Sequence, residues 1–160
     1  IQQQDDFVSD CSIDTDLEIL IPDDYVESIT ERLTLYSRLD NCESEQDLAE
    51  FHAEMHDRFG PVPPQVEDLF TTVRCRKLAV ELGFEKLVLR HETLRGYFVS
   101  NPDSPYFQSA MFNGILQFLQ TGTNKAKLKQ VGKNGMLVVD GIRTMHDMYD
   151  FFSRMRKSIS

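Results

Sequence analysis

The first half of the chain places apolar residues every three or four positions, the spacing that gives an α-helix one apolar face. The spacing predicts three successive helices, over 24–39, 45–59 and 64–82. Ser44 is placed to cap the second helix, and Gly60 to end it. The apolar stripe of the first helix is expected at Val26, Ile29, Leu33 and Tyr36. That of the second is expected at Leu48, Phe51, Met55 and Phe59.

The second half of the chain changes to the short, β-rich runs typical of strands. They predict two hairpins, and a further apolar run before Pro22 predicts an N-terminal edge strand. The expected strands are 17–21, 84–90, 94–99, 127–131 and 136–139. Two more helices are expected, over 107–118 and after Gly141. We therefore predict an α+β fold in a single compact domain, with a strand and three-helix segment followed by two hairpins and two helices.

Length and composition fit one such domain, since the chain has 160 residues, 41% of them hydrophobic. Residues 1–12 are polar and aperiodic, so we expect a lead-in there and the regulatory domain itself over 13–160. No leader sequence and no apolar run of about 18 residues is apparent, which favours an internal piece of a cytoplasmic protein with no membrane partner. Three widely spaced cysteines are expected to be reduced and structural.

Charge argues against binding to nucleic acid. Seventeen Lys and Arg against 26 Asp and Glu give a formal net charge of −9, opposite to the sign needed for phosphates. No direct nucleic-acid partner is expected on this ground. One local exception remains open, because the lysines of the second hairpin either protect a sheet edge or contact DNA. They are Lys125, Lys127, Lys129 and Lys133.

Candidate chemistry concentrates on the second helix. His52 and His56 are four residues apart and share a helix face, but Ala53 stands where the H-E-x-x-H zinc motif requires Glu. Glu54 and Asp57 share another face, away from the apolar stripe. No phosphate-binding loop or nucleophile elbow is present, so no enzyme, catalytic residue, cofactor or metal is expected. The default is a protein-binding domain, and the alternative is a small metal- or carboxylate-dependent hydrolase built on these four side chains.

Three segments carry a resemblance to a known family, and they are 21–26 (IPDDYV), 54–61 (EMHDRFGP) and 77–83 (KLAVELG). In order and spacing they resemble the C-terminal domain of the bacterial transcription-repair coupling factors. The resemblance extends from about Ile13 to Leu87. The second segment, taken with Pro63, is its most specific part, because it joins an acidic helix end to a glycine stop and two prolines that restart a helix.

The resemblance implies a function for the domain. The family's parent proteins are ATP-driven DNA translocases that remove stalled RNA polymerase and recruit nucleotide excision repair through UvrA. The domain is then expected to be autoinhibitory, docking on the parent's N-terminal UvrB-like module and masking the UvrA-binding surface. By motif position, Glu54 and Asp57 are the expected contact pair. Arg58 is expected either at the same interface or as a support for the helix end.

Overall fold

The computed structural model describes residues 7–121, 125–132 and 134–159, which form two compact units. A helical unit comprises residues 18–73, and a sheet unit comprises residues 1–17 and 74–160; α3 runs through both. In chain order the elements are β1 (Ser12–Thr15), α1 (Ile29–Asp40), α2 (Glu45–Phe59), α3 (Pro64–Leu82), β2 (Phe84–Arg90), β3 (Thr93–Phe98), the 3-10 helix η1 (Pro105–Gln108), α4 (Ala110–Leu119), β4 (Ala126–Val131), β5 (Asn134–Asp140) and α5 (Met145–Ser158). The predicted α+β class is confirmed.

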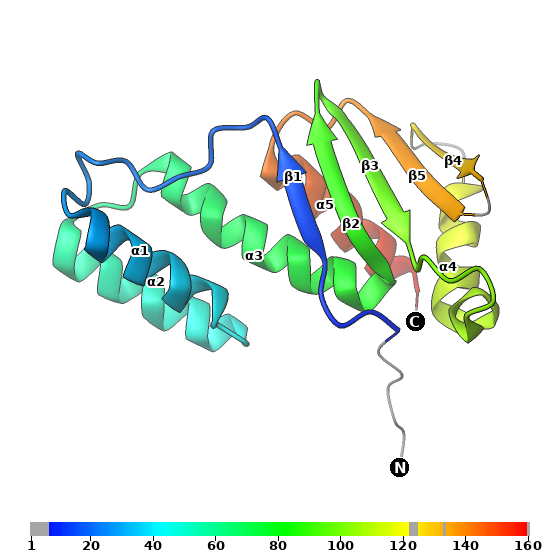
Figure 1. Ribbon diagram of the computed structural model, residues 1–160, viewed down its shortest axis with the longest axis horizontal. Helices are drawn as coiled ribbons and strands as arrows, with labels where there is room; N and C mark the ends of the chain where they lie inside the picture. Colours follow the sequence, from blue (N-terminus) through cyan, green and yellow to red (C-terminus); the bar gives the residue numbers. More distant parts are fainter. Residues whose placement is uncertain (1–6, 122–124, 133, 160) are drawn as a thin grey trace, which may run out of the picture. The chain divides into compact units, whose positions relative to one another are not determined.

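The helical unit forms where local signals are strong, and α1 and α2 lie side by side in it (Figure 1). Ser44 caps α2 by accepting a hydrogen bond from the Asp47 N–H at 3.0 Å. Gly60 ends the helix with a positive φ of 93°, a conformation that side chains disfavour. Of the apolar stripe predicted for α2, Leu48, Phe51 and Met55 are buried and Phe59 is half-buried.

The first helix differs from the prediction in its start and in its buried face. It begins at Ile29, because Ser28 caps it by accepting from the Glu31 N–H. The acidic pair at 23–24 lies instead in a turn in which two N–H groups donate to the Pro22 carbonyl. Leu35 and Leu39 are the buried residues of α1. The predicted stripe members Ile29 and Leu33 are 67% and 64% exposed, so that part of the prediction was wrong.

The sheet unit contains one five-stranded sheet in the order β1-β2-β3-β5-β4. β1 pairs in parallel with β2, and all other pairs are antiparallel. Figure 1 shows α5 behind the strands, on one face of the sheet. The two predicted hairpins are confirmed, and the first turns through His91 and Glu92, both at positive φ.

Two further predicted elements are placed differently. The expected strand over 17–21 was wrong: β1 lies earlier, and the Thr15 side chain accepts from the Leu17 N–H where the strand ends. Ile21 is buried in the core of the helical unit instead. The expected helix over 107–118 is divided at Ser109, which ends η1 and caps α4 by accepting from the Phe112 N–H at 3.2 Å.

The expected lead-in falls partly on described residues. Val8 and Cys11 are 3% and 1% exposed, and the Phe7 ring packs edge-on against Tyr106 at 5.5 Å. Phe7, Val8 and Cys11 are therefore packed within the sheet unit. Residues 1–6 of the expected lead-in lie outside the described residues.

Candidate functional site

The candidate site is the outward face of α2, which the helix packing fixes. Burial of Leu48, Phe51 and Met55 directs the positions between them away from the core. Glu54 lies at the border of this face with its side chain 38% exposed, and Arg58 is 42% exposed. Asp57 is exposed. The three residues predicted as interface therefore share one accessible surface of α2.

Glu54 is not a free carboxylate, since two arginines hold it. Arg38 on α1 donates to both of its oxygens, with Nη1–Oε2 at 2.5 Å and Nη2–Oε1 at 2.7 Å. Arg58, four residues along α2, lies 3.5 Å from Oε2 and also pairs with Glu31 of α1. The result is a chain of alternating charges, Glu31–Arg58–Glu54–Arg38, that links the two helices. A bidentate arginine fixes orientation as well as charge.

The ionisation of Glu54 follows from this geometry. The two hydrogen bonds from the Arg38 guanidinium lower the pKa of the Glu54 carboxyl from 4.5 to about 2, with smaller contributions from Arg58. Glu54 is therefore negatively charged at any physiological pH. Arg38 is itself oriented by the Phe51 ring, whose centroid lies 4.6 Å from the guanidinium carbon.

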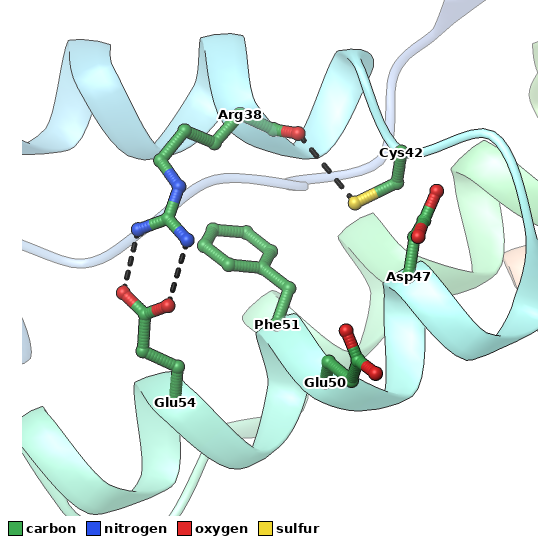
Figure 2. Close-up of a pocket in the computed structure, with 6 residues that line it drawn as sticks. All are labelled: Arg38, Cys42, Asp47, Glu50, Phe51 and Glu54. Carbon is green, nitrogen blue, oxygen red and sulfur yellow. Dashed lines mark hydrogen bonds and ion pairs between the residues drawn. The ribbon is translucent and has the colours of Figure 1, made fainter.

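A shallow pocket of about 180 Å³ opens beside this ion pair. Figure 2 shows the pair on one side of the Phe51 ring and the carboxylates of Asp47 and Glu50 on the other. Cys42 lines the pocket as well, and its thiol donates to the Arg38 carbonyl oxygen at 3.5 Å. The pocket therefore has an aromatic wall and an acidic rim, which suits contact with a basic side chain.

Asp57 differs from Glu54 in its surroundings. Among the described residues it makes no hydrogen bond or ion pair, and it lies in the last turn of α2. A carboxylate is unfavourable there, because the C-terminal end of a helix carries partial negative charge. Asp57 is consequently a poor contributor to the helix and an available acceptor for a cation from outside.

The histidines of α2 are not brought together with the acids. His52 Nε2 lies 2.9 Å and 3.0 Å from the two Glu67 oxygens of α3, and its ring meets Phe70 edge-on at 5.1 Å. His56 is exposed. No group of three or more His, Cys, Asp or Glu side chains in the described part of the chain could hold a metal ion. The metal-dependent form of the hydrolase alternative thus has no assembled metal centre in residues 7–121, 125–132 and 134–159.

Arg38 and Glu31 are the members of the site that sequence reasoning missed. Their contacts join residues 16 and 27 positions apart, so no helical spacing signals them. The only available hint was that both are charged residues of one helix, which is equally typical of a solvated face. Among the described residues, no helix is both long enough and apolar enough to cross a bilayer.

Comparison with known proteins identifies relatives for most of the chain. A family model described as the TRCF domain matches residues 15–109. The transcription-repair-coupling factor of Rickettsia conorii is 33% identical over 122 residues, covering 76% of this chain and 10% of the relative. That of Escherichia coli is 31% identical over 98 residues, covering 61% and 8%. A crystal structure of the C-terminal domain of transcription-repair coupling factor has the same fold, with a TM-score of 0.75 at 14% identity and 94% coverage of each chain. The chain spans about a tenth of the length of the first of these curated relatives.

Proposed function

This chain belongs to the TRCF-domain family of transcription-repair coupling factors, and on that basis we propose that it is an autoinhibitory protein-interaction domain. It docks on the N-terminal UvrB-like module of its parent protein and masks the surface that binds UvrA. Docking restrains the parent's ATP-driven DNA translocase until RNA polymerase is engaged. The parent acts in transcription-coupled nucleotide excision repair in the cytoplasm, and this domain contributes regulation and no catalysis.

The observation that carries the proposal is the position of Asp57. It is exposed in the last turn of α2, where a negative charge is disfavoured by the helix and is paired with nothing in the described residues. An exposed carboxylate without a partner among the described residues is available to a basic side chain of another surface. We therefore assign the main contact to Asp57 and a basic side chain of the UvrB-like module.

Glu54 takes a second role in this proposal. Its carboxylate oxygens already accept from Arg38, but a carboxylate has about four acceptor sites and retains capacity for one more donor. The ion pair presents that capacity in a fixed orientation, which lowers the entropy lost on docking. Arg58 contributes by linking Glu54 to Glu31.

A regulatory contact must also release, and the composition of this face is suited to that. Its three predicted residues are charged and at least one-third exposed, as expected at the rim of a transient interface. Exposed ion pairs contribute little each and are weakened by salt. Docking through them is steered by charge and depends on several weak contacts together.

The test is calorimetric binding of this chain to the separately expressed UvrB-like module of the same parent, with Asp57→Asn as the variant. We expect about ten-fold weaker binding, because one charge pair is lost. Folding stability should be unchanged or slightly higher, since the unfavourable charge at the end of α2 is removed. Asp103→Asn is the matched control, because it removes an exposed acid from the sheet unit.

Two results would contradict the assignment. Equal binding by the wild type and the Asp57→Asn variant would remove this residue from the interface. Equal losses in the Asp57→Asn and Asp103→Asn variants would instead mean that only total charge matters. If the wild-type chain fails to bind the module even at high concentration and low salt, the docking proposal itself fails.

A further inference from the structure

The sheet unit has a free edge at β4 that the proposed docking through α2 does not use. β4 pairs with β5 on one side, from Ala126↔Val139 to Val131↔Asn134. In the described part of the chain no strand pairs with its other side. Such an edge presents backbone N–H and C=O groups that can pair with an added strand.

A groove adjoins this edge. It has a volume of about 300 Å³, and its apolar lining comes from Phe98, Phe107, Phe112 and Leu128. Leu128 lies in the middle of β4 and is 45% exposed, although it faces the same side of the sheet as the buried Leu137. The groove therefore offers an apolar site large enough for one side chain, directly beside the free edge.

The charge of this region is opposite to that of the whole chain. From Ser104 to Val139 there is no Asp or Glu and there are four lysines, in a chain whose formal net charge is −9. Lys127 and Lys129 alternate with Leu128 on β4 and are exposed. Lys133, the fourth lysine, lies outside the described residues. The described part of the edge attracts an acidic partner by charge complementarity.

Protection of the edge by lysines does not account for the groove. Lysines on an edge strand discourage the addition of another strand. Here Leu128 and Val131 are 45% and 56% exposed on the same strand, which is unusual for an edge that only needs to be shielded. An edge with exposed apolar side chains next to lysines is suited to binding a partner strand that carries acidic side chains on one face and apolar side chains on the other.

We propose that the edge of β4 and its groove bind an extended acidic segment of a partner protein as an additional strand. The partner's backbone pairs with β4, its acids lie beside Lys127 and Lys129, and one apolar side chain enters the groove. This is strand addition with charge selection, in which the backbone gives affinity and the side chains give specificity. The edge belongs to the sheet unit and the α2 face to the helical unit, so either interaction can fail alone.

The probe is a synthetic peptide of about twelve residues in which Asp alternates with Val around a central Phe, long enough to span one strand. It is titrated into the isotopically labelled 160-residue chain and followed by amide NMR, with fluorescence anisotropy for affinity. We expect saturable shifts at 126–131 and at the groove phenylalanines. Two control peptides are each N-methylated at one of the two alternating sets of residues, so that one of them loses the backbone N–H groups facing β4. That peptide should bind at least about ten-fold more weakly, because its pairing donors are lost.

Matched variants separate this site from a general charge effect. The double variant Lys127→Glu, Lys129→Glu should weaken peptide binding about ten-fold. The control double variant Lys86→Glu, Lys157→Glu makes the same charge change elsewhere, and it should alter peptide binding less than about two-fold. Leu128→Ser tests the groove and should also weaken binding. Leu128 and both lysines of β4 are exposed, so the fold is expected to persist, and circular dichroism checks this.

Four outcomes would overturn the proposal. The first two are an absence of saturable shifts at β4, and equal loss of binding in the two double-lysine variants. The third is concentration-dependent self-association through β4 without peptide, which would make the occupant a second copy of the chain. The fourth is tighter binding of a single-stranded oligodeoxynucleotide of the peptide's length at the same lysines, which would assign the surface to nucleic acid.

Discussion

Replacing Gly83 by Ala tests how the sheet unit is packed around Tyr106. Gly83 follows α3 with a φ of +102°, and a Cβ there would overlap the Tyr106 ring. The ring cannot move aside easily, because Tyr106 is 1% exposed and its hydroxyl donates to the Leu82 carbonyl oxygen at 2.6 Å. It is also surrounded by four aromatic rings, those of Phe7, Phe98, Phe107 and Phe112.

The expected loss has two parts. A left-handed backbone costs a residue with a Cβ about 1–2 kcal/mol, and forcing extra volume into a close-packed core costs about 1–3 kcal/mol more. We therefore expect Gly83→Ala to lower the free energy of unfolding by about 2–5 kcal/mol. Gly141→Ala is the control, since Gly141 has a φ of +80° with nothing within 4 Å of the added Cβ. It should lose only the backbone part.

Urea unfolding measures both variants. The chain has five tyrosines and no tryptophan, so tyrosine fluorescence and far-ultraviolet circular dichroism are the suitable signals. In a Tyr106→Leu background, Gly83→Ala should lower the free energy of unfolding by less than it does in the wild type, because the smaller side chain makes room for the new methyl group. If Gly83→Ala costs no more than Gly141→Ala, the packing of Tyr106 against this turn is not as rigid as described.

Three further predictions concern the helical unit. Ile29→Ser with Leu33→Ser should change the free energy of unfolding by less than about 1 kcal/mol, because both side chains are exposed; a large loss in urea unfolding would show that they are packed. Arg38→Met should return the pKa of Glu54 from about 2 towards 4.5, as read by carboxyl NMR. It should also remove the stabilisation that the wild-type ion pair provides above about pH 4.5 and loses as the pH falls to about 2. An unchanged pKa of Glu54 would exclude Arg38 as the cause of its shift. Cys42 should react first with a disulfide reagent, since burial raises the pKa of the other two thiols to about 12, and three equal rates would contradict this.

The parts of the fold that the sequence predicts well are those fixed by neighbouring residues. α2 was located because Ser44 and Gly60 mark its ends within the chain itself. The hairpin of β2 and β3 was located because two strand-like runs are separated by a very short turn. In each case the signal and the structure lie within a few residues of each other, so no knowledge of distant contacts is needed.

The errors occur where distant contacts decide. Residues 24–39 contain apolar positions on more than one face, and periodicity alone could not show that Leu35 and Leu39 face the core while Ile29 and Leu33 face solvent. Similarly, β1 is defined by parallel pairing with β2, more than seventy residues later in the chain. Both choices depend on elements whose positions the local sequence does not contain.

Distant contacts also decide the roles of the candidate site residues, and they determine which variant can test docking. Glu54 and Asp57 look equivalent in sequence, as two acids on one helical face, yet Glu54 is held by Arg38 and Asp57 is paired with nothing in the described residues. Removing Glu54 frees Arg38 and breaks the link between α1 and α2, so weaker docking by such a variant would mix a structural loss with an interface loss. Removing Asp57 leaves that network intact. Only the Asp57 variant therefore reports on docking alone, and a change in its affinity without a loss of stability would distinguish contact from support.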